Sequence, residues 1–267
     1  MTDLVVVDAF TAEPFRGNQA AICLLDGPAD PVWMQRVAAE MNLSETAFLH
    51  PLDDGTRSLR WFTPTVEVEL CGHATLASAH VLFTDGHAGP DEVLRFTTRS
   101  GVLTASLVGG RVELDFPRFG WELDDERVRI AAALRIDPSL ILATATGGGN
   151  HLAEVPDPAT VVGLQPAFAL VADLPLGGVI VTAMGPGGAT GPDTVSRYFA
   201  SAHGIDEDPV TGSAHCLIGP WFAARLGPEL RCHQASARGG DLHVTVGQER
   251  VRLAGDAVIT LRASLLV

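Results

Sequence analysis

Residues 65–80 read TVEVELCGHATLASAH, and this stretch decides how the rest of the chain is interpreted. Its first part alternates apolar and acidic residues as a strand does, and its last part is rich in Ala and Leu as a helix is. The small residues Cys71 and Gly72 lie between the two parts. A strand that enters a helix through such a turn leaves backbone N–H groups and the positive end of the helix dipole available to an anion.

A second copy of this pattern lies about half of the 267-residue chain further on. Arg60-Trp61-Phe62-Thr63 precedes the first copy, and Arg197-Tyr198-Phe199-Ala200 precedes Thr211-Gly212-Ser213-Ala214, which leads into another apolar helix. We therefore predict two related lobes, residues 1–117 and 118–267, with the last strand allowed to return to the first lobe. If the lobes face each other about a pseudo-twofold axis, the two helix N-termini converge on one cleft, a preferred place for a ligand.

The remaining segments favour an α+β domain with curled, mostly antiparallel sheets rather than a βαβ repeat. An N-cap at Asp30 and a proline at Pro31 predict an amphipathic helix over 31–41. Further helices are expected at 125–134 and 216–226, and strands at 4–10, 19–25, 60–63, 93–98, 101–107, 111–116, 152–155, 177–183, 242–246, 250–253 and 258–261. The glycine-rich turn at 144–151 lacks the GxGxxG spacing and precedes a strand, which argues against a dinucleotide site. Residues 184–192 are expected to form a loop.

Composition excludes several classes of function. An apolar fraction of 46% with 19% charged residues is typical of a globular protein, and a net charge of −14 argues against binding to nucleic acid or an anionic membrane. There is no apolar run of the roughly 18 residues needed for a membrane span, and no signal peptide. Four scattered cysteines are typical of reduced thiols in a cytoplasmic protein. All 18 basic residues are arginines, which excludes lysine Schiff-base chemistry and a Walker P-loop.

Two helix N-termini aimed at one carboxylated substrate would stabilise the negative charge that develops when a proton is removed beside the carboxylate. Glu45, His73 and Asp208 are the candidates for the general acid/base. The residues alone leave other interpretations open: a solvated strand-end Glu45, a helix-capping or packing His73, and an Asp208 that caps a turn. Cys71 could be a nucleophile activated by the helix end or a small buried residue. No spacing typical of a metal site is present.

Four stretches of the chain resemble one known family. Leu43-Ser44-Glu45-Thr46-Ala47-Phe48, Cys71-Gly72-His73-Ala74-Thr75 and the run from Glu207 to Ala214 are similar to signature stretches of the PhzF-like phenazine-biosynthesis isomerases. Asp8-Ala9-Phe10-Thr11 with Gly17-Asn18 is similar to the N-terminal pattern of that family. The resemblance covers essentially the whole chain in order. It implies the diaminopimelate-epimerase fold, in which each of two lobes wraps a curled antiparallel sheet around a central helix.

The resemblance also implies roles for individual residues. Glu45 would be the general acid/base, and His73 and Asp208 would assist by positioning or proton relay. The substrate would be bound by residues at the helix ends and in the cleft, namely Gly72, Gly212, Ser213 and Asn18. The family's best-known reaction isomerises trans-2,3-dihydro-3-hydroxyanthranilate without a cofactor. Related epimerases use a cysteine at each helix end, but here the counterpart of Cys71 is Thr211, so a one-base isomerisation on a single face is favoured.

The sequence therefore predicts a cofactor-independent isomerase that acts on a small carboxylated substrate and holds no metal. The alternatives are a racemase or epimerase that uses Cys71 alone, and a non-catalytic protein that binds small anions on the same scaffold. The resemblance also implies a possible homodimer.

Overall fold

The computed structural model describes residues 2–189 and 191–266, so residue 190 of the predicted loop at 184–192 lies outside the described part. The chain forms two compact units: Met1–Phe116 with Leu253–Val267 (unit 1), and Pro117–Arg252 (unit 2). Among the helices described, none is long and apolar enough to cross a membrane.

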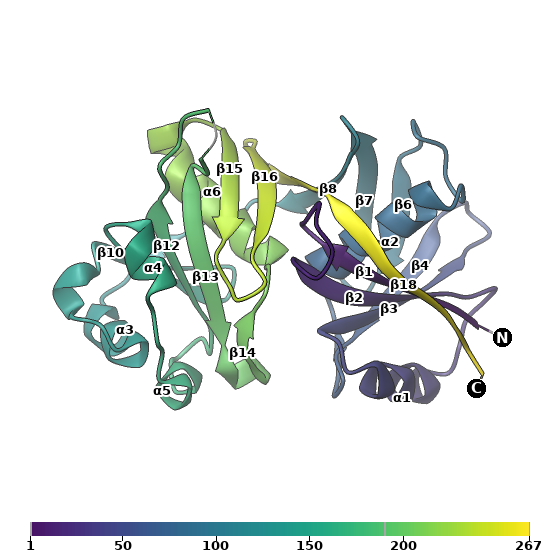
Figure 1. Ribbon diagram of the computed structural model, residues 1–267, viewed down its shortest axis with the longest axis horizontal. Coiled ribbons are helices and arrows are strands. Elements are labelled where there is room, and N and C mark those ends of the chain that lie inside the picture. Colours follow the sequence, from purple (N-terminus) through teal and green to yellow (C-terminus); the bar gives the residue numbers. More distant parts are fainter. Residues whose placement is uncertain (1, 190, 267) are drawn as a thin grey trace. The chain divides into compact units, whose positions relative to one another are not determined.

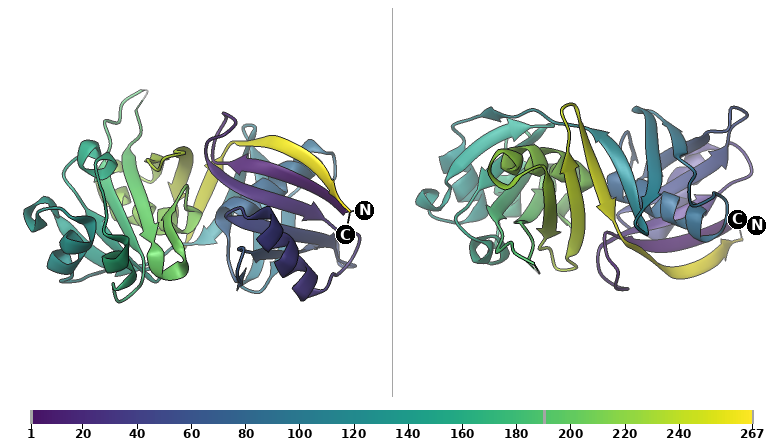
Figure 2. Two further views of the ribbon diagram at one scale, coloured as in Figure 1. Left: turned by 60° about the horizontal axis from the view of Figure 1, so that its bottom comes forward. Right: turned by 90° about the horizontal axis from the view of Figure 1, so that it is seen from above.

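Unit 1 is a sheet that surrounds one helix. Its elements are β1 (Thr2–Ala9), β2 (Asn18–Leu24), α1 (Pro31–Met41), β3 (Glu45–Pro51), β4 (Arg57–Phe62), β5 (Glu67–Val68), α2 (Gly72–Thr84), β6 (Leu94–Thr98), β7 (Gly101–Val108), β8 (Arg111–Pro117) and β18 (Ala257–Leu265). The strands pair in the order β18-β1-β2-β3-β4-β6-β7-β8. The β2–β3 and β4–β6 pairs are parallel and the other pairs in this order are antiparallel. Strands β1 and β18 run side by side in both views of Figure 2 and bring the two ends of the chain together.

Helix α2 is the centre of unit 1. Strands β1, β2, β3, β7 and β18 all contact it (Figure 1). Because its buried positions lie all around the helix, its Ala- and Leu-rich sequence is apolar on every side rather than amphipathic. Its buried hydroxyls bond within the helix: Thr75 Oγ1 donates to the Cys71 carbonyl at 2.6 Å, and Ser78 Oγ donates to the Ala74 carbonyl at 2.7 Å. Both hydroxyls therefore have a partner within the helix and leave no unsatisfied donor in the core around it.

Unit 2 repeats this arrangement. Its elements are β9 (Glu122–Leu123), α3 (Arg127–Leu134), the 3-10 turn η1 (Pro138–Leu140), β10 (Ala143–Gly147), β11 (Asn150–Glu154), α4 (Pro158–Val162), α5 (Phe168–Ala172), β12 (Val179–Met184), β13 (Thr194–Ala200), the 3-10 turn η2 (Ser201–His203), β14 (Ile205–Asp208), α6 (Gly212–Leu226), β15 (Glu229–Gln234) and β16 (Gly240–Val246). Unit 2 ends within β17 (Arg250–Gly255), whose residues from Leu253 onward belong to unit 1. The β11–β12 and β13–β15 pairs are parallel, as β2–β3 and β4–β6 are in unit 1. Helix α6 packs on β15 and β16 (Figure 1).

Helix α6 tolerates a proline in its interior. Pro220 has no N–H, so the carbonyl of Cys216 loses its usual partner four residues on. The backbone N–H of Phe119 donates to that carbonyl at 3.2 Å instead. A segment just after the chain enters unit 2 thus replaces the missing helical hydrogen bond.

Most predicted elements are present, with shifted ends. Helix α1 begins at Pro31 with Asp30 as its N-cap, as predicted, and the Asp30 carboxylate accepts a hydrogen bond from Val32 N–H. Helix α6 begins at Gly212 and not at Cys216, because burial of its first turn overcomes the weak helix propensity of Gly and Ser. The predicted strand at 65–70 is wrong in length, since only Glu67–Val68 pairs. Several elements were not predicted, among them β10, α5 and β15.

Candidate active site

The N-terminus of α2 has no capping side chain. Cys71 is the N-cap, with an extended backbone (φ −144°, ψ 110°), and its side chain makes no capping hydrogen bond. The first turn, which starts at Gly72, contains no acidic residue. The backbone N–H groups of this turn therefore keep their capacity to bind an anion.

Glu45 and His73 meet beside this helix end. Glu45 is the first residue of β3, opposite Ala20 of the parallel strand β2, and its residue exposure is 8%. Its Oε2 lies 3.0 Å from Nε2 of His73, which is 5% exposed. The two atoms form a buried ion pair when His73 is protonated, and within the part of the chain that the structure describes neither atom has another partner. A buried carboxylate oxygen and imidazole nitrogen that have only each other are costly to keep in a folded core, and a functional site is a common explanation.

The surroundings of His73 favour its charged form. Burial disfavours the imidazolium, but the Cys71 sulfur and the Glu45 carboxylate favour it, and the net result raises the pKa of His73 well above its ordinary value. Cys71 Sγ lies 3.5 Å from Nδ1 of the ring. Burial raises the pKa of the Cys71 thiol, so the thiol keeps its proton at neutral pH. Glu45 is then the negative charge that a protonated His73 balances.

Asn18 contacts the other nitrogen of the same ring. Its Nδ2 lies 3.2 Å from His73 Nδ1, and it is fully buried at the start of β2. The loop before it is tightly folded: Phe15 has φ +69°, and its N–H donates to Oδ2 of the buried Asp8 at 2.7 Å. A Cβ on Gly17 (φ +65°) would overlap the Ala9 carbonyl, so the turn requires glycine. The motif that precedes Asn18 thus fixes where its amide lies.

Glu45, Cys71 and His73 could also be considered as metal ligands, because their donor atoms lie within 4.8 Å of one another. The geometry does not favour a shared ion. Cys71 lies against Nδ1 of the ring and Glu45 lies against Nε2, so an ion in line with either nitrogen would face away from one of the two other ligands. The arrangement suits proton transfer through the imidazole better than coordination.

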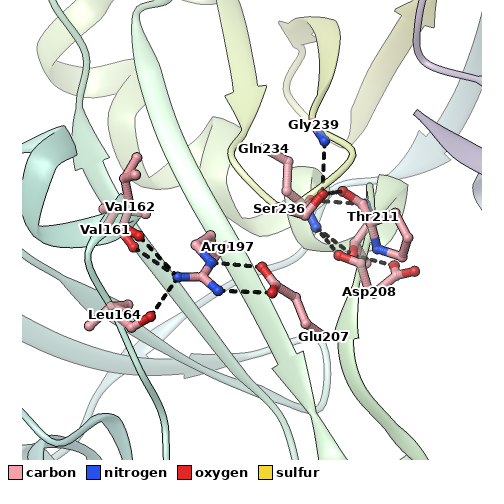
Figure 3. Close-up of polar contacts among 11 residues, drawn as sticks. Val161, Val162, Leu164, Arg197, Glu207, Asp208, Thr211, Gln234, Ser236 and Gly239 are labelled. Atoms are coloured by element: carbon pink, nitrogen blue, oxygen red, sulfur yellow. Dashed lines mark hydrogen bonds and ion pairs between the residues drawn. The ribbon is translucent and has the colours of Figure 1, made fainter. Parts of the chain in front are cut away.

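The N-terminus of α6 is the counterpart in unit 2. Thr211 is its N-cap and makes no capping hydrogen bond, and the first turn carries no acidic side chain. Gly212 and Ser213 are the first two residues of the helix. Asp208 ends β14, and its Oδ2 accepts a short hydrogen bond from Thr211 Oγ1 (Figure 3). A carboxylate therefore lies beside this helix end too, but it is already bound to a neighbouring hydroxyl.

Only unit 1 carries a carboxylate at the position of Glu45. Phe62 and Phe199 end the two copies of the Arg-aromatic-Phe pattern, and they lie opposite Thr46 and Val179 on the neighbouring strands. The residues before these partners are Glu45 in unit 1 and Gly178 in unit 2. A Cβ on Gly178 would lie 2.7 Å from Asn150 Oδ1 and 2.8 Å from the Tyr198 hydroxyl, so a side chain there would have to displace these two groups. The pseudo-repeat is therefore chemically asymmetric.

The structure gathers the predicted site residues into two groups. Glu45, His73, Asn18 and Gly72 cluster with Cys71 in unit 1, and Asp208, Gly212 and Ser213 cluster in unit 2. One further polar residue of unit 2, Gln234, contacts the second group and was not a candidate from the sequence. The available signal was its place after Leu230 and Cys232 on the apolar face of an alternating strand, where a glutamine needs polar partners.

Comparison with known proteins extends these observations. A profile of the PhzC-PhzF family, described as "Phenazine biosynthesis-like protein", matches residues 7–263. A protein of Halalkalibacterium halodurans named "uncharacterized isomerase" is 46% identical over 270 residues, which cover 100% of this chain and 99% of that protein. The mouse "phenazine biosynthesis-like domain-containing protein 2" is 41% identical over 283 residues, covering 98% of each chain.

A solved structure agrees with these matches. The crystal structure of a PhzF-family phenazine biosynthesis protein from Enterococcus faecalis superposes with a TM-score of 0.91 and 38% identity, covering 99% of each chain. This similarity confirms the predicted α+β fold of the diaminopimelate-epimerase type. Since sequence and fold match along nearly the whole chain, this protein belongs to the PhzC-PhzF family of phenazine biosynthesis-like proteins.

Proposed function

We propose that this protein is an isomerase that moves a proton on a small carboxylated substrate by general acid/base catalysis, with Glu45 as the acid/base. The observation that carries the proposal is the buried contact between Glu45 Oε2 and His73 Nε2, which lie 3.0 Å apart, with no other partner among the described residues, beside the uncapped N-terminus of α2. The 46% identical relative that is named an isomerase supports the reaction class.

In this mechanism Glu45 removes a proton from a carbon conjugated with the substrate's carboxylate. The negative charge spreads toward that carboxylate, where helix N–H groups stabilise it. Protonated Glu45 then returns the proton to another carbon of the conjugated system, so the product is an isomer and no electrons are gained or lost. His73 holds the Glu45 carboxylate through its charge, and the Asn18 side chain lies against the ring of His73.

The residues of unit 2 complete the proposal. Gly212 and Ser213 at the start of α6 would bind the substrate through their backbone N–H groups, and Ser213 through its hydroxyl as well. Asp208 would assist by positioning or proton relay. The Gly178 counterpart of Glu45 argues for one base, and therefore for proton transfer on a single face of the substrate.

The experiment uses trans-2,3-dihydro-3-hydroxyanthranilate in D2O and follows isomerisation and deuterium uptake by proton NMR. We expect Glu45→Gln to lose at least about 100-fold of the rate, the usual contribution of a general acid/base, with unchanged circular dichroism. Glu40→Gln, at an exposed position of α1, is the matched control and should keep the wild-type rate. Undiminished exchange in Glu45→Gln would refute the role of Glu45.

The alternative of a non-catalytic anion-binding protein has its own outcome. Cyclic and amino carboxylic acids are screened for thermal stabilisation of the wild-type protein, and the compounds that stabilise it are incubated in D2O. If neither these compounds nor the probe trans-2,3-dihydro-3-hydroxyanthranilate take up deuterium, the isomerase assignment is wrong and anion binding is favoured.

A further inference from the structure

Gln234 is a buried amide whose three hydrogen bonds all go to the segment that leads into α6. It ends β15 and is fully buried. Its Oε1 accepts from Thr211 N–H at 2.9 Å, and its Nε2 donates to the Asp208 carbonyl at 2.8 Å and to Thr211 Oγ1 at 3.2 Å (Figure 3). One side chain thus binds both ends of the turn that carries Asp208 and the N-cap.

The direction of these hydrogen bonds is determined. A threonine hydroxyl has one proton, and Thr211 Oγ1 gives it to Asp208 Oδ2. The same oxygen must then accept from Gln234, which requires the amide nitrogen to face it. The amide oxygen must in turn face Thr211 N–H. The chain therefore runs Gln234 Nε2–H to Thr211 Oγ1–H to Asp208 Oδ2, and turning the amide over would break all three hydrogen bonds of Gln234.

The residue before Asp208 is held as firmly. Glu207 receives two hydrogen bonds from Arg197, at 2.7 and 2.8 Å, and the same guanidinium donates to the Leu164 carbonyl at 2.9 Å (Figure 3). The backbone of β14 is thereby fixed on one side by Arg197 and on the other by Gln234. The freedom left to Asp208 is in its side chain, and the Thr211 hydroxyl removes it.

Unit 1 has no such device at the matching position. The parallel pairs β4–β6 and β13–β15 place Thr98 where unit 2 has Gln234. Thr98 Oγ1 donates to the Gly101 carbonyl at 2.6 Å, within its own turn. The three hydrogen bonds of Gln234 to Asp208 and Thr211, which we call the Gln234 clamp, therefore belong to the unit that carries Asp208. They are not a requirement of the repeated fold.

We propose that Gln234 is a positioning residue, which aims the Asp208 carboxylate through Thr211 and fixes the peptide plane from which the Gly212 and Ser213 N–H groups point. The inference rests on the proposed function, because it assigns this geometry to catalysis. A displacement of a reacting group by about 1 Å can cost about 100-fold in rate, so losing the clamp should lower kcat/KM by about 10- to 100-fold.

Two substitutions separate positioning from a merely structural role. Gln234→Met keeps the size of the side chain and removes all three hydrogen bonds. Gln234→Glu keeps the oxygen that accepts from Thr211 N–H and loses both N–H donors. When ionised, the new carboxylate would also repel Asp208; when protonated at lower pH, its O–H can again donate to Thr211 Oγ1.

Two buried titratable groups near Gln234 keep their charge state over the range used. His215 of α6 is neutral, because burial lowers its pKa to about 4, and Tyr198 of β13 is neutral, because burial and Asp208 raise its pKa to about 12. The remaining neighbours are Asp208 itself and the His233–Asp241 pair beside β15, 2.8 Å apart. Because all of these are present in every variant, dividing each rate by the wild-type rate at the same pH removes their effect.

The first measurement is kcat/KM for trans-2,3-dihydro-3-hydroxyanthranilate between pH 5.5 and 8.5. We expect the kcat/KM of Gln234→Glu, divided by that of wild type at the same pH, to rise at least about fivefold as the pH falls. The corresponding kcat/KM ratio for Gln234→Met should stay below one and should not change with pH. Gln248→Glu, at an exposed turn of the same unit, is the matched control and should keep a ratio of one. A flat ratio for Gln234→Glu, or wild-type kcat/KM in Gln234→Met, would overturn the inference.

The second measurement does not depend on activity. Hydrogen exchange should show the Thr211 N–H at least about tenfold less protected in Gln234→Met than in wild type, and still protected in Gln234→Glu. Unchanged protection in Gln234→Met would refute the clamp even in an active enzyme. If the wild-type protein does not act on the probe but the exchange pattern is as expected, the clamp stands and the proposed function is what fails.

Discussion

Arg60 and Arg197 occupy matching positions in the two units and make the same pair of bonds. Arg60 donates to both carboxylate oxygens of Glu67 at 2.8 and 2.9 Å, as Arg197 does to Glu207. Each guanidinium also lies over the ring two residues further on, 5.2 Å from the Phe62 centroid and 4.8 Å from that of Phe199. Each pair holds a short strand that leads to the N-cap of a central helix.

We expect Arg197→Met to destabilise the protein more than Arg60→Met. Arg197 is the more buried of the two, with a side-chain exposure of 12% against 25%, and it alone bonds to carbonyls at the end of α4. Arg197→Met leaves the Glu207 carboxylate without its buried partner and should lower the free energy of unfolding by about 3 kcal/mol. Arg60→Met removes hydrogen bonds to the charged Glu67 and should lower it by about 2 kcal/mol. Urea unfolding measures the free energy of unfolding of both variants. Arg16→Met, at an exposed position, is the control and should leave that free energy almost unchanged. Equal costs at all three positions would contradict this.

His73 should make the protein less stable as the pH rises. Its pKa in the folded state lies above the ordinary 6.5, so its bound proton contributes full stability below pH 6.5. That contribution is lost as the pH rises through the raised pKa of the folded state. Urea unfolding of wild type and His73→Asn at several pH values should show a stability difference that is largest below pH 6.5 and declines above it.

The control for His73 is Glu45→Gln, which removes the negative charge beside the imidazole. In that background the pKa of His73 should fall and the effect of His73→Asn should depend less on pH. A pH-independent difference between wild type and His73→Asn would show that folding does not raise the pKa of His73.

His215 should act in the opposite direction. It is fully buried in α6, and its Nδ1 lies 2.8 Å from the Thr211 carbonyl. Burial lowers its pKa to about 4, so the neutral ring contributes full stability above pH 6.5, and this is lost as the pH falls toward 4. The loss amounts to about 3 kcal/mol for a shift of this size. Wild type should therefore lose more stability than His215→Asn between pH 6.5 and 4; parallel losses would contradict the assignment.

Cys71→Ala should keep its proton-transfer activity within about threefold of wild type. The thiol keeps its proton at neutral pH because burial raises its pKa, and its counterpart in unit 2 is Thr211 rather than a second cysteine. The assay is deuterium uptake by the same probe. A loss of about 100-fold, as for a catalytic group, would favour the racemase or epimerase alternative instead.

The sequence predicted those parts of the fold and site that local patterns encode. The N-cap at Asp30, the two apolar central helices and the position of Glu45 at the start of a strand follow from spacing and composition. The proximity of Glu45, His73 and Asn18 does not, because β2, β3 and α2 meet only through long-range pairing. The sequence pattern also gave no reason to connect Gln234 with Asp208.

The elements that were missed have physical reasons as well. The strand at 143–147 is mostly Ala, Thr and Gly, so it lacks the β-branched apolar run of a typical strand, and its partners on both sides define it. The five-residue helix at 168–172 is too short for its periodicity to be recognised. Parallel pairing of β2 with β3 depends on the crossover through α1, which an element list alone does not specify.

The return of the C-terminal strand to unit 1 affects how the chain folds as it is synthesised. Strand β1 pairs along its whole length with β18, so β1 finds this partner only after all of unit 2 has been made. Unit 2 is continuous in the chain and can fold before β18 is available. Unit 1 begins earlier in the chain than unit 2, but its sheet is completed later, because vectorial folding reaches the whole of unit 2 before it reaches β18.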